Sequence, residues 1–308
     1  MYKHTTDEVV MIRPEGFYSN QETAVNNVYQ NENDEKLEVI QANALKEFDN
    51  LADLLREKGL KVHVLQDTPN PSTPDSIFPN NWFSTHEGGT MVVYPMFAGN
   101  RQEEIYKFKG QVEEITRNKT GEGLFRVLDY SNNHFTNKQV LEGTGAMVID
   151  RKNKVAYCCL SPRANKELFE KFCAETGHTP VTFQSWQDGQ PVYHANVVMG
   201  IGEKIAVICL ESIPDETERK NVKESLEKGG NIIVDITLAQ VKEFLGNNLE
   251  LKGKDGNFLA MSETAYKSLT AEQKAIIEEH VEILHANIHN IEFYGGGSVR
   301  CMIAEIFG

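Results

Sequence analysis

The sequence predicts an α/β fold built from a small unit that recurs about five times, and two observations support this. Strand-like and helix-like segments follow one another in the same order, a strand hairpin, a helix and a strand, along most of the chain. No Pro-, Gly- or Ser-rich linker divides it, so we expect a single domain over residues 1–308. Repetition of one small unit favours a radial array over a doubly wound sheet.

The first elements set the pattern. Residues 8–13 are strand-like, and residues 34–58 carry apolar side chains at helical spacing until Gly59. Residues 61–66 (KVHVLQ) alternate as a strand. The following segments continue the order: strand 90–96, a helix from Arg101, strand 124–130, hairpin 145–160, helix 164–177, strand 180–186, hairpin 195–210, helix 215–230, strand 231–237, hairpin 249–262, helix 262–285 and strand 291–294. The last apolar strand, 301–307, has no helix after it, and we expect it to pair with the N-terminal strand and close a ring.

The composition restricts the choice of partners. A net charge of −14 argues against binding to nucleic acid or to anionic membranes, both of which need clustered Lys and Arg. No apolar run has the length of a signal peptide or a membrane span. The five cysteines are odd in number and match no zinc spacing, so we expect free thiols in a reducing cytoplasm. We expect a small-molecule partner and no cofactor, and whether the chain forms a homo-oligomer stays open.

Polar clusters stand where simple patterning predicts only turns, just before the first central strand of successive units. Equivalent positions of radially arranged repeats meet near the common axis, so these side chains should converge although they are far apart in sequence. They are Asn81, Glu142, His194, Asn196 and Cys301.

A cysteine close to a histidine and a carboxylate is the arrangement that enzymes with a cysteine nucleophile use. A thiol becomes reactive as thiolate, which a nearby imidazolium favours, so Cys301 is the candidate nucleophile. His194 is the candidate acid/base, and Glu142 the candidate partner that orients it. Taken singly, each residue is as readily explained as a core or turn residue; their shared place in the repeat distinguishes them. His280, His285 and His289 offer a rival metal site, but no carboxylate or cysteine pattern completes it, and we expect no metal.

Six stretches resemble the guanidino-group-modifying superfamily, whose fold is a five-bladed α/β-propeller (pentein) of ββαβ units. The chain is most similar to the citrulline-utilisation hydrolase or amidinotransferase-like branch, related to arginine deiminase and dimethylarginine dimethylaminohydrolase. The resemblance implies Cys301 as nucleophile, His194 as acid/base and Glu142 as carboxylate partner. It also implies that Asp75 contacts the substrate amino group and that Arg101 and Arg163 contact its carboxylate. A guanidinium can donate two parallel N–H groups to the two oxygens of a carboxylate. The stretches, in family order, are PDSIFPNNW (74–82), MFAGNR (96–101), LEGTGAMVI (141–149), SPRAN (161–165), YHANVVM (193–199) and GGGSVRCM (295–302).

The chain departs from the family pattern at two positions. Guanidino enzymes hold the cationic group with two aspartates, and the matching residues here are Asn81 and Asn196. Burying a guanidinium without carboxylates is costly, whereas an Asn amide can meet both the carbonyl and the N–H groups of a neutral ureido group. We therefore predict hydrolysis of citrulline to ornithine, ammonia and carbon dioxide through an S-carbamoyl intermediate. The alternatives are a hydrolase, deiminase or amidinotransferase acting on arginine or on a methylated or acylated arginine, and, from another class, a non-catalytic binding protein of the same fold.

Overall fold

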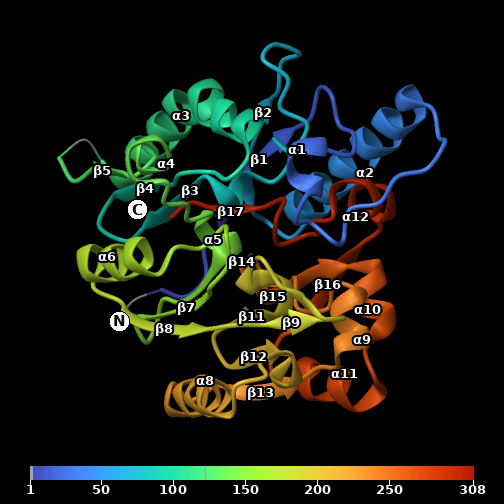
Figure 1. Cartoon of the computed structure of the whole chain (residues 1–308). Coiled ribbons are helices and arrows are strands. Elements are labelled where there is room, and N and C mark those ends of the chain that lie inside the picture. Colours follow the sequence, from blue (N-terminus) through green and yellow to red (C-terminus); the bar gives the residue numbers. More distant parts are fainter. Residues whose placement is uncertain (1–2, 122) are drawn as a thin grey trace.

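Five three-stranded sheets form the framework of the computed structural model, which describes residues 3–121 and 123–308 (Figure 1). In each sheet the middle strand pairs antiparallel on one side and parallel on the other. This is the repeated unit that the sequence predicts. The sheets are β17 (Ala304–Glu305), β1 (Glu8–Arg13) and β2 (Lys61–Gln66); β3 (Phe83–His86), β4 (Thr90–Val93) and β5 (Arg126–Asp129); β6 (Met147–Asp150), β7 (Val155–Cys159) and β8 (Thr179–Phe183); β11 (Met199–Ile201), β12 (Ile205–Ile208) and β13 (Ile232–Asp235); β14 (Leu249–Gly253), β15 (Gly256–Ser262) and β16 (Glu282–Ala286).

The two ends of the chain meet in the first of these sheets. β17 pairs antiparallel with β1, Val9 lying opposite Glu305 and Val10 opposite Ala304. The predicted pairing of the last strand with the first is therefore confirmed, although β17 is shorter than the predicted strand 301–307. A small additional ribbon is formed by β9 (Trp186–Gln187) and β10 (Gln190–Pro191).

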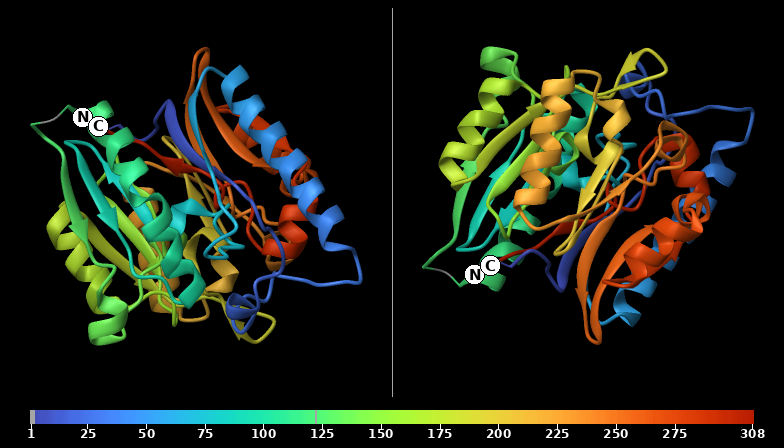
Figure 2. Two further views of the ribbon diagram at one scale, coloured as in Figure 1. Left: turned by 90° about the horizontal axis from the view of Figure 1, so that it is seen from above. Right: turned by 90° about the horizontal axis from the view of Figure 1, so that it is seen from below.

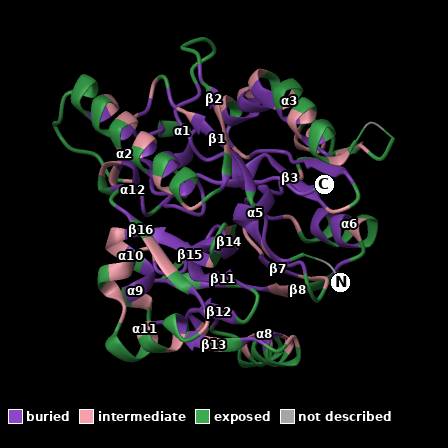
Figure 3. Cartoon of the chain, turned by 180° about the vertical axis from the view of Figure 1, so that it is seen from behind, coloured by how far each residue is buried: buried purple, intermediate pink, exposed green. Residues whose placement is uncertain are grey.

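Helices connect the second and third strands of each sheet and lie around the outside of the molecule (Figure 2). Some of them begin at a side-chain cap; Asn165 and Asp215, for example, accept from backbone N–H groups of the helices that follow them. Figure 3 shows the outward sides of these helices exposed and the strands between them buried. They are α2 (Leu37–Glu57), α3 (Gly99–Thr120), α6 (Lys166–Thr176), α8 (Glu216–Lys228), and the pair α10 (Glu263–Ser268) and α11 (Ala271–Glu278).

Two predictions near the C-terminus were wrong. The expected single helix over 262–285 is α10 and α11 followed by β16, because Ser262 and Thr270 each cap a new helix start; Thr270 does so in a capping box with Gln273. The expected strand 291–294 lies within the helix α12 (His289–Gly295), which buries Ile291 and Tyr294 and ends at Gly296 in the left-handed conformation.

Short helical turns complete the structure, and some of them lie at the centre, where the units meet. They are α1 (Gln21–Ala24), η1 (Pro79–Asn81), α4 (Asn133–Asn137), α5 (Gly143–Ala146), α7 (Ala195–Val198), η2 (Leu210–Ser212) and α9 (Leu238–Lys242). Of these, α5 packs against both η1 and α7, so the polar clusters of three units come together as predicted. No helix within the described ranges is long and apolar enough to cross a bilayer.

Candidate active site

Glu142 and His194 form a buried pair at the centre of the molecule. Glu142 stands directly before α5 and His194 directly before α7, so the packing of the two turns brings the side chains together. Glu142 Oε2 lies 2.7 Å from His194 Nε2, and the two residues are 0% and 3% exposed. The sequence predicted this meeting between positions far apart in the chain.

Glu142 is held ionised by its surroundings. Its Oε1 accepts from the backbone N–H of Phe97 at 2.9 Å, and Arg163 Nη1 lies 3.5 Å from its Oε2. Burial would raise the pKa of this carboxyl, but Arg163, His194 and Arg101 together hold it below its ordinary value. Glu142 can therefore orient His194 and compensate a positive charge that forms on the imidazole.

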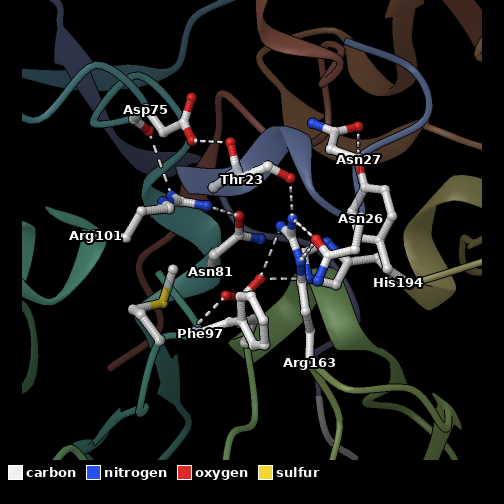
Figure 4. Close-up of polar contacts among 12 residues, drawn as sticks. Thr23, Asn26, Asn27, Asp75, Asn81, Phe97, Arg101, Arg163 and His194 are labelled. Atoms are coloured by element: carbon white, nitrogen blue, oxygen red, sulfur yellow. Dashed lines mark hydrogen bonds and ion pairs between the residues drawn. The ribbon is translucent and has the colours of Figure 1, made fainter. Parts of the chain in front are cut away.

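His194 is neutral in the free protein, and its second nitrogen is available for proton transfer. Burial lowers its pKa to about 4, although the hydrogen bond to Glu142 opposes the shift. Because Nε2 faces Glu142, Nδ1 faces the space above Gly145, where Asn81 Nδ2 also lies. Figure 4 shows the Asn81 amide nitrogen directed toward the side of the site on which His194 lies. A neutral imidazole with a free Nδ1 can accept a proton from a nucleophile and return it to a leaving amine.

Gly145 keeps this space open. A Cβ there would overlap Asn81 Nδ2 and lie 2.7 Å from His194 Nδ1. We expect Gly145→Ala to lower kcat/KM by about 10- to 100-fold, because the added methyl group displaces both side chains. Gly110→Ala on an exposed turn of α3 is the matched control, since a Cβ there meets nothing within 4 Å. Steady-state assays should find the control unchanged, and an unchanged Gly145→Ala enzyme would contradict this placement of the reacting space.

Cys301 accepts hydrogen bonds from two side-chain amides. Asn196 Nδ2 lies 3.4 Å and Asn247 Nδ2 3.2 Å from its Sγ. The sulfur of Cys301 therefore lies among amide N–H donors. The other cysteines have no such environment: burial raises the pKa of Cys159, Cys173 and Cys209 to about 12 and moves that of Cys158 in the same direction.

Asn247 is a site residue that the sequence analysis missed. It also donates to the carbonyl of Asn196 at 3.0 Å and accepts from the backbone N–H of Arg300 at 3.0 Å, so it ties α7 to the loop that carries Cys301. The signal was present: Asn247 precedes β14, the first strand of its unit, in the same position as the other polar clusters.

Asp75 and Arg163 both contact the N-terminal segment 20–26. Asp75 Oδ2 accepts from Asn20 Nδ2 at 2.8 Å and from Thr23 Oγ1 at 3.1 Å, while its Oδ1 is buried without a hydrogen-bond partner. Arg163 donates to the Thr23 carbonyl at 3.1 Å and to Asn26 Oδ1 at 2.9 Å from Nε (Figure 4). Binding of a substrate carboxylate at Arg163 would therefore compete with Asn26. The predicted roles of Asp75 and Arg163 at the substrate head group remain predictions.

Arg101 lies on the other side of Asn81 and is enclosed by protein groups. It is 3% exposed and bonds to Glu104, to Asn81 and to backbone carbonyls of the 75–78 loop. Its predicted contact with a substrate carboxylate also remains a prediction.

The histidines near the C-terminus do not gather. Across residues 3–121 and 123–308, no three His, Cys, Asp or Glu side chains are arranged to hold a metal ion. His285 lies in β16 and stacks on Tyr266 with ring centroids 4.1 Å apart, while His289 begins α12.

Buried neutral histidines should make the stability depend on pH. Burial lowers the pKa of His194 to about 4 and that of His178 to about 3, from 6.5. As the pH falls below 6.5 the unfolded chain binds protons on these groups before the folded chain does, so the free energy of unfolding should fall. We expect His178→Asn, outside the site, to reduce this slope by up to about 1.4 kcal/mol per pH unit. Urea titrations between pH 6.5 and 4 test this, and equal slopes would contradict it.

Glu142, His194 and Cys301 all lie around α5 and α7, where the repeated α/β units meet, and this arrangement of repeated units and polar residues is that of the pentein superfamily. The profile of the family "N,N dimethylarginine dimethylhydrolase, eukaryotic" matches residues 13–308. The chain belongs to this family. Sequence comparison with curated proteins gave no match.

Solved structures show the same fold at low sequence identity. ArgZ, an arginine dihydrolase from the ornithine-ammonia cycle in cyanobacteria, superimposes with a TM-score of 0.76 at 15% identity over 97% of this chain. This chain spans 40% of full-length ArgZ, and 98% of its N-terminal domain in the substrate-bound structure. Dimethylarginine dimethylaminohydrolase, as an adduct with S-methyl-L-thiocitrulline, gives a TM-score of 0.65 at 12% identity, over 99% of both chains.

Proposed function

We propose that this protein hydrolyses the ureido group of citrulline to ornithine, ammonia and carbon dioxide, with Cys301 as nucleophile. The observation that carries the proposal is the asparagine chemistry around the sulfur. Asn196 donates to Cys301 Sγ through Nδ2, and its Oδ1 is buried without a hydrogen-bond partner. A bound substrate that places an N–H group there would satisfy this buried hydrogen-bond acceptor.

A ureido group matches these groups better than a guanidinium does. Its NH2 can donate to Asn196 Oδ1, and its carbonyl can accept from an amide N–H. A buried guanidinium needs carboxylates, and Glu142 is already bonded to His194, Arg163 and the Phe97 N–H. Asp75 Oδ1 is the open carboxylate oxygen, and we assign it to the substrate amino group.

In the proposed reaction the sulfur of Cys301 bonds to the ureido carbon while its proton passes to His194 Nδ1. The amine leaves with that proton, and an S-carbamoyl group remains on the enzyme. Water then attacks the carbamoyl carbon, His194 takes a proton from it and returns one to the sulfur, and the released carbamate yields ammonia and carbon dioxide. Amide N–H groups stabilise the developing oxyanion.

Hydrolysis of the guanidino group of arginine is the second candidate. It is favoured by the similarity of the fold to arginine dihydrolases and to dimethylarginine dimethylaminohydrolase. In either case we propose that the five sheets surround the site as a propeller. We also propose that the protein acts in the reducing cytoplasm, because its five cysteines are buried and form no disulfide.

Side-by-side assays of citrulline and arginine distinguish the two candidates. We expect purified enzyme to release ornithine from citrulline and to prefer it over arginine in kcat/KM by at least about tenfold, because one buried unmatched donor costs at least about 1.4 kcal/mol. Amino-acid analysis of the products measures both reactions. Turnover of arginine with citrulline inert would make the protein a guanidino hydrolase, and turnover of neither would reject both.

A further inference from the structure

Arg101 and Glu104 form a fully buried ion pair in the first turns of α3. Arg101 Nε lies 2.8 Å from Glu104 Oε1, and Arg101 Nη2 lies 3.1 Å from Glu104 Oε2, a two-point contact. The residues are 3% and 0% exposed. The guanidinium plane is thereby fixed relative to the helix.

The remaining donors of Arg101 are directed at η1 and at the loop that leads into it. Nη2 donates to the backbone carbonyls of Phe78 at 2.9 Å and Asp75 at 3.3 Å, and Nη1 donates to Asn81 Oδ1 at 2.6 Å. A guanidinium has five N–H groups. At most one is left for a substrate carboxylate, so protein groups account for nearly all of its hydrogen-bonding capacity.

This contact determines which end of the Asn81 amide faces the reacting space. An amide flip would place the NH2 group against the guanidinium, where two donors would meet without an acceptor. With Oδ1 turned to Arg101, Nδ2 donates to Asn80 Oδ1 at 3.1 Å and points into the space above Gly145 beside His194 Nδ1 (Figure 4). Asn81 therefore presents a donor, and not an acceptor, to the group that reacts.

We propose that Arg101 and Glu104 are positioning residues that lock Asn81 as an N–H donor and so select a substrate carbonyl against a guanidinium. A carbonyl oxygen accepts from this donor, whereas every nitrogen of a guanidinium presents N–H groups or no free lone pair to it. The choice of the ureido group as the favoured substrate rests on the proposed function. The locking of Asn81 rests on the contacts alone.

Two roles of Arg101, positioning Asn81 and binding the substrate carboxylate, have different effects on the affinities for citrulline and arginine. Citrulline and arginine share the same α-amino acid head, so loss of a carboxylate contact weakens both ligands equally. Loss of the lock on Asn81 acts only on the ureido or guanidino end, and changes the ratio of the two affinities.

The test measures the dissociation constants of citrulline and arginine by calorimetry, in a Cys301→Ala background that prevents turnover. Asn81→Asp keeps the acceptor for Arg101 and replaces the inward donor by an acceptor, so the affinity ratio should shift towards arginine by about tenfold or more. Arg101→Lys should shift it in the same direction, since an ammonium cannot hold Glu104 at two points and Asn81 together. Glu104→Gln should shift it less, because a neutral partner still bonds to Arg101.

Lys107→Gln is the matched control on the same helix. Lys107 ties α3 to the preceding loop through Asp67 and Thr73, at 2.8 Å each, without contacting Asn81. Its variant should keep the affinity ratio of the parent. Equal weakening of both ligands in Arg101→Lys, or an unchanged ratio in Asn81→Asp, would overturn the proposal. Because the readout is a ratio of affinities, it stands apart from turnover: an enzyme that hydrolyses only arginine would reject the proposed function and still report whether the lock exists.

Discussion

Cys301→Ala is expected to lose turnover by at least about 10⁴-fold, the largest effect of any substitution considered, because in the proposed mechanism the covalent intermediate forms on the Cys301 sulfur. The substitution removes only a sulfur atom at a residue that is 7% exposed. Asn247 keeps its bonds to the Asn196 carbonyl and to the Arg300 N–H, so the loop geometry should persist.

Two measurements separate loss of chemistry from loss of structure in Cys301→Ala. Substrate should still bind, which calorimetry measures, and the midpoint of urea unfolding should move little. Cys209→Ala is the matched control: Cys209 is fully buried, its pKa is raised to about 12, and its loss should cost stability but leave kcat intact. Residual turnover above about one per cent in Cys301→Ala would remove this residue from the role of nucleophile.

Glu142→Gln is expected to lower kcat by about 10²- to 10⁴-fold. In the proposed mechanism the carboxylate holds His194 so that Nδ1 faces the substrate, and it compensates the charge on the imidazole during proton transfer. A neutral amide supplies no such charge. It also cannot accept at both ends, so its NH2 must face either the Phe97 N–H or the His194 and Arg163 side of the site.

The same conflict should destabilise the protein by about 1–3 kcal/mol, so single-turnover rates must be read beside urea unfolding. Asp150→Asn serves as control, since Asp150 is a buried carboxylate bonded to Asn153 in the hairpin between β6 and β7. It should lose stability and retain kcat. A Glu142→Gln enzyme with normal kcat would show that orientation and charge at His194 are not needed.

The repeated unit could be predicted because the local order of apolar and polar residues determines its strands and turns. Apolar runs on either side of polar turns indicate β7 and β12, and the polar residues before the strands place Glu142 and His194 at one centre. The region after β15 was less predictable: two closely spaced helix starts, at Ser262 and Thr270, looked like one helix because apolar spacing continued across the break.

The parts of the site that escaped prediction depend on contacts between distant residues. The motif around Arg101 suggested a substrate ligand, yet the structure shows its guanidinium bonded to Glu104, three residues along α3, and to Asn81 in η1. Likewise, nothing in the composition of segment 20–26 predicts that Asn20 and Asn26 lie against Asp75 and Arg163. Local sequence carries the periodicity of elements, but not the direction of a buried amide or guanidinium.

The central claim, a carbamoyl group carried by Cys301, is tested most directly by rapid acid quench with citrulline labelled at the ureido carbon, followed by peptide mapping. We predict label on the peptide that contains Cys301, absent from Cys301→Ala and chased off by water during further incubation. Label on another cysteine, or labelling by guanidino-labelled arginine with none from citrulline, would contradict the account.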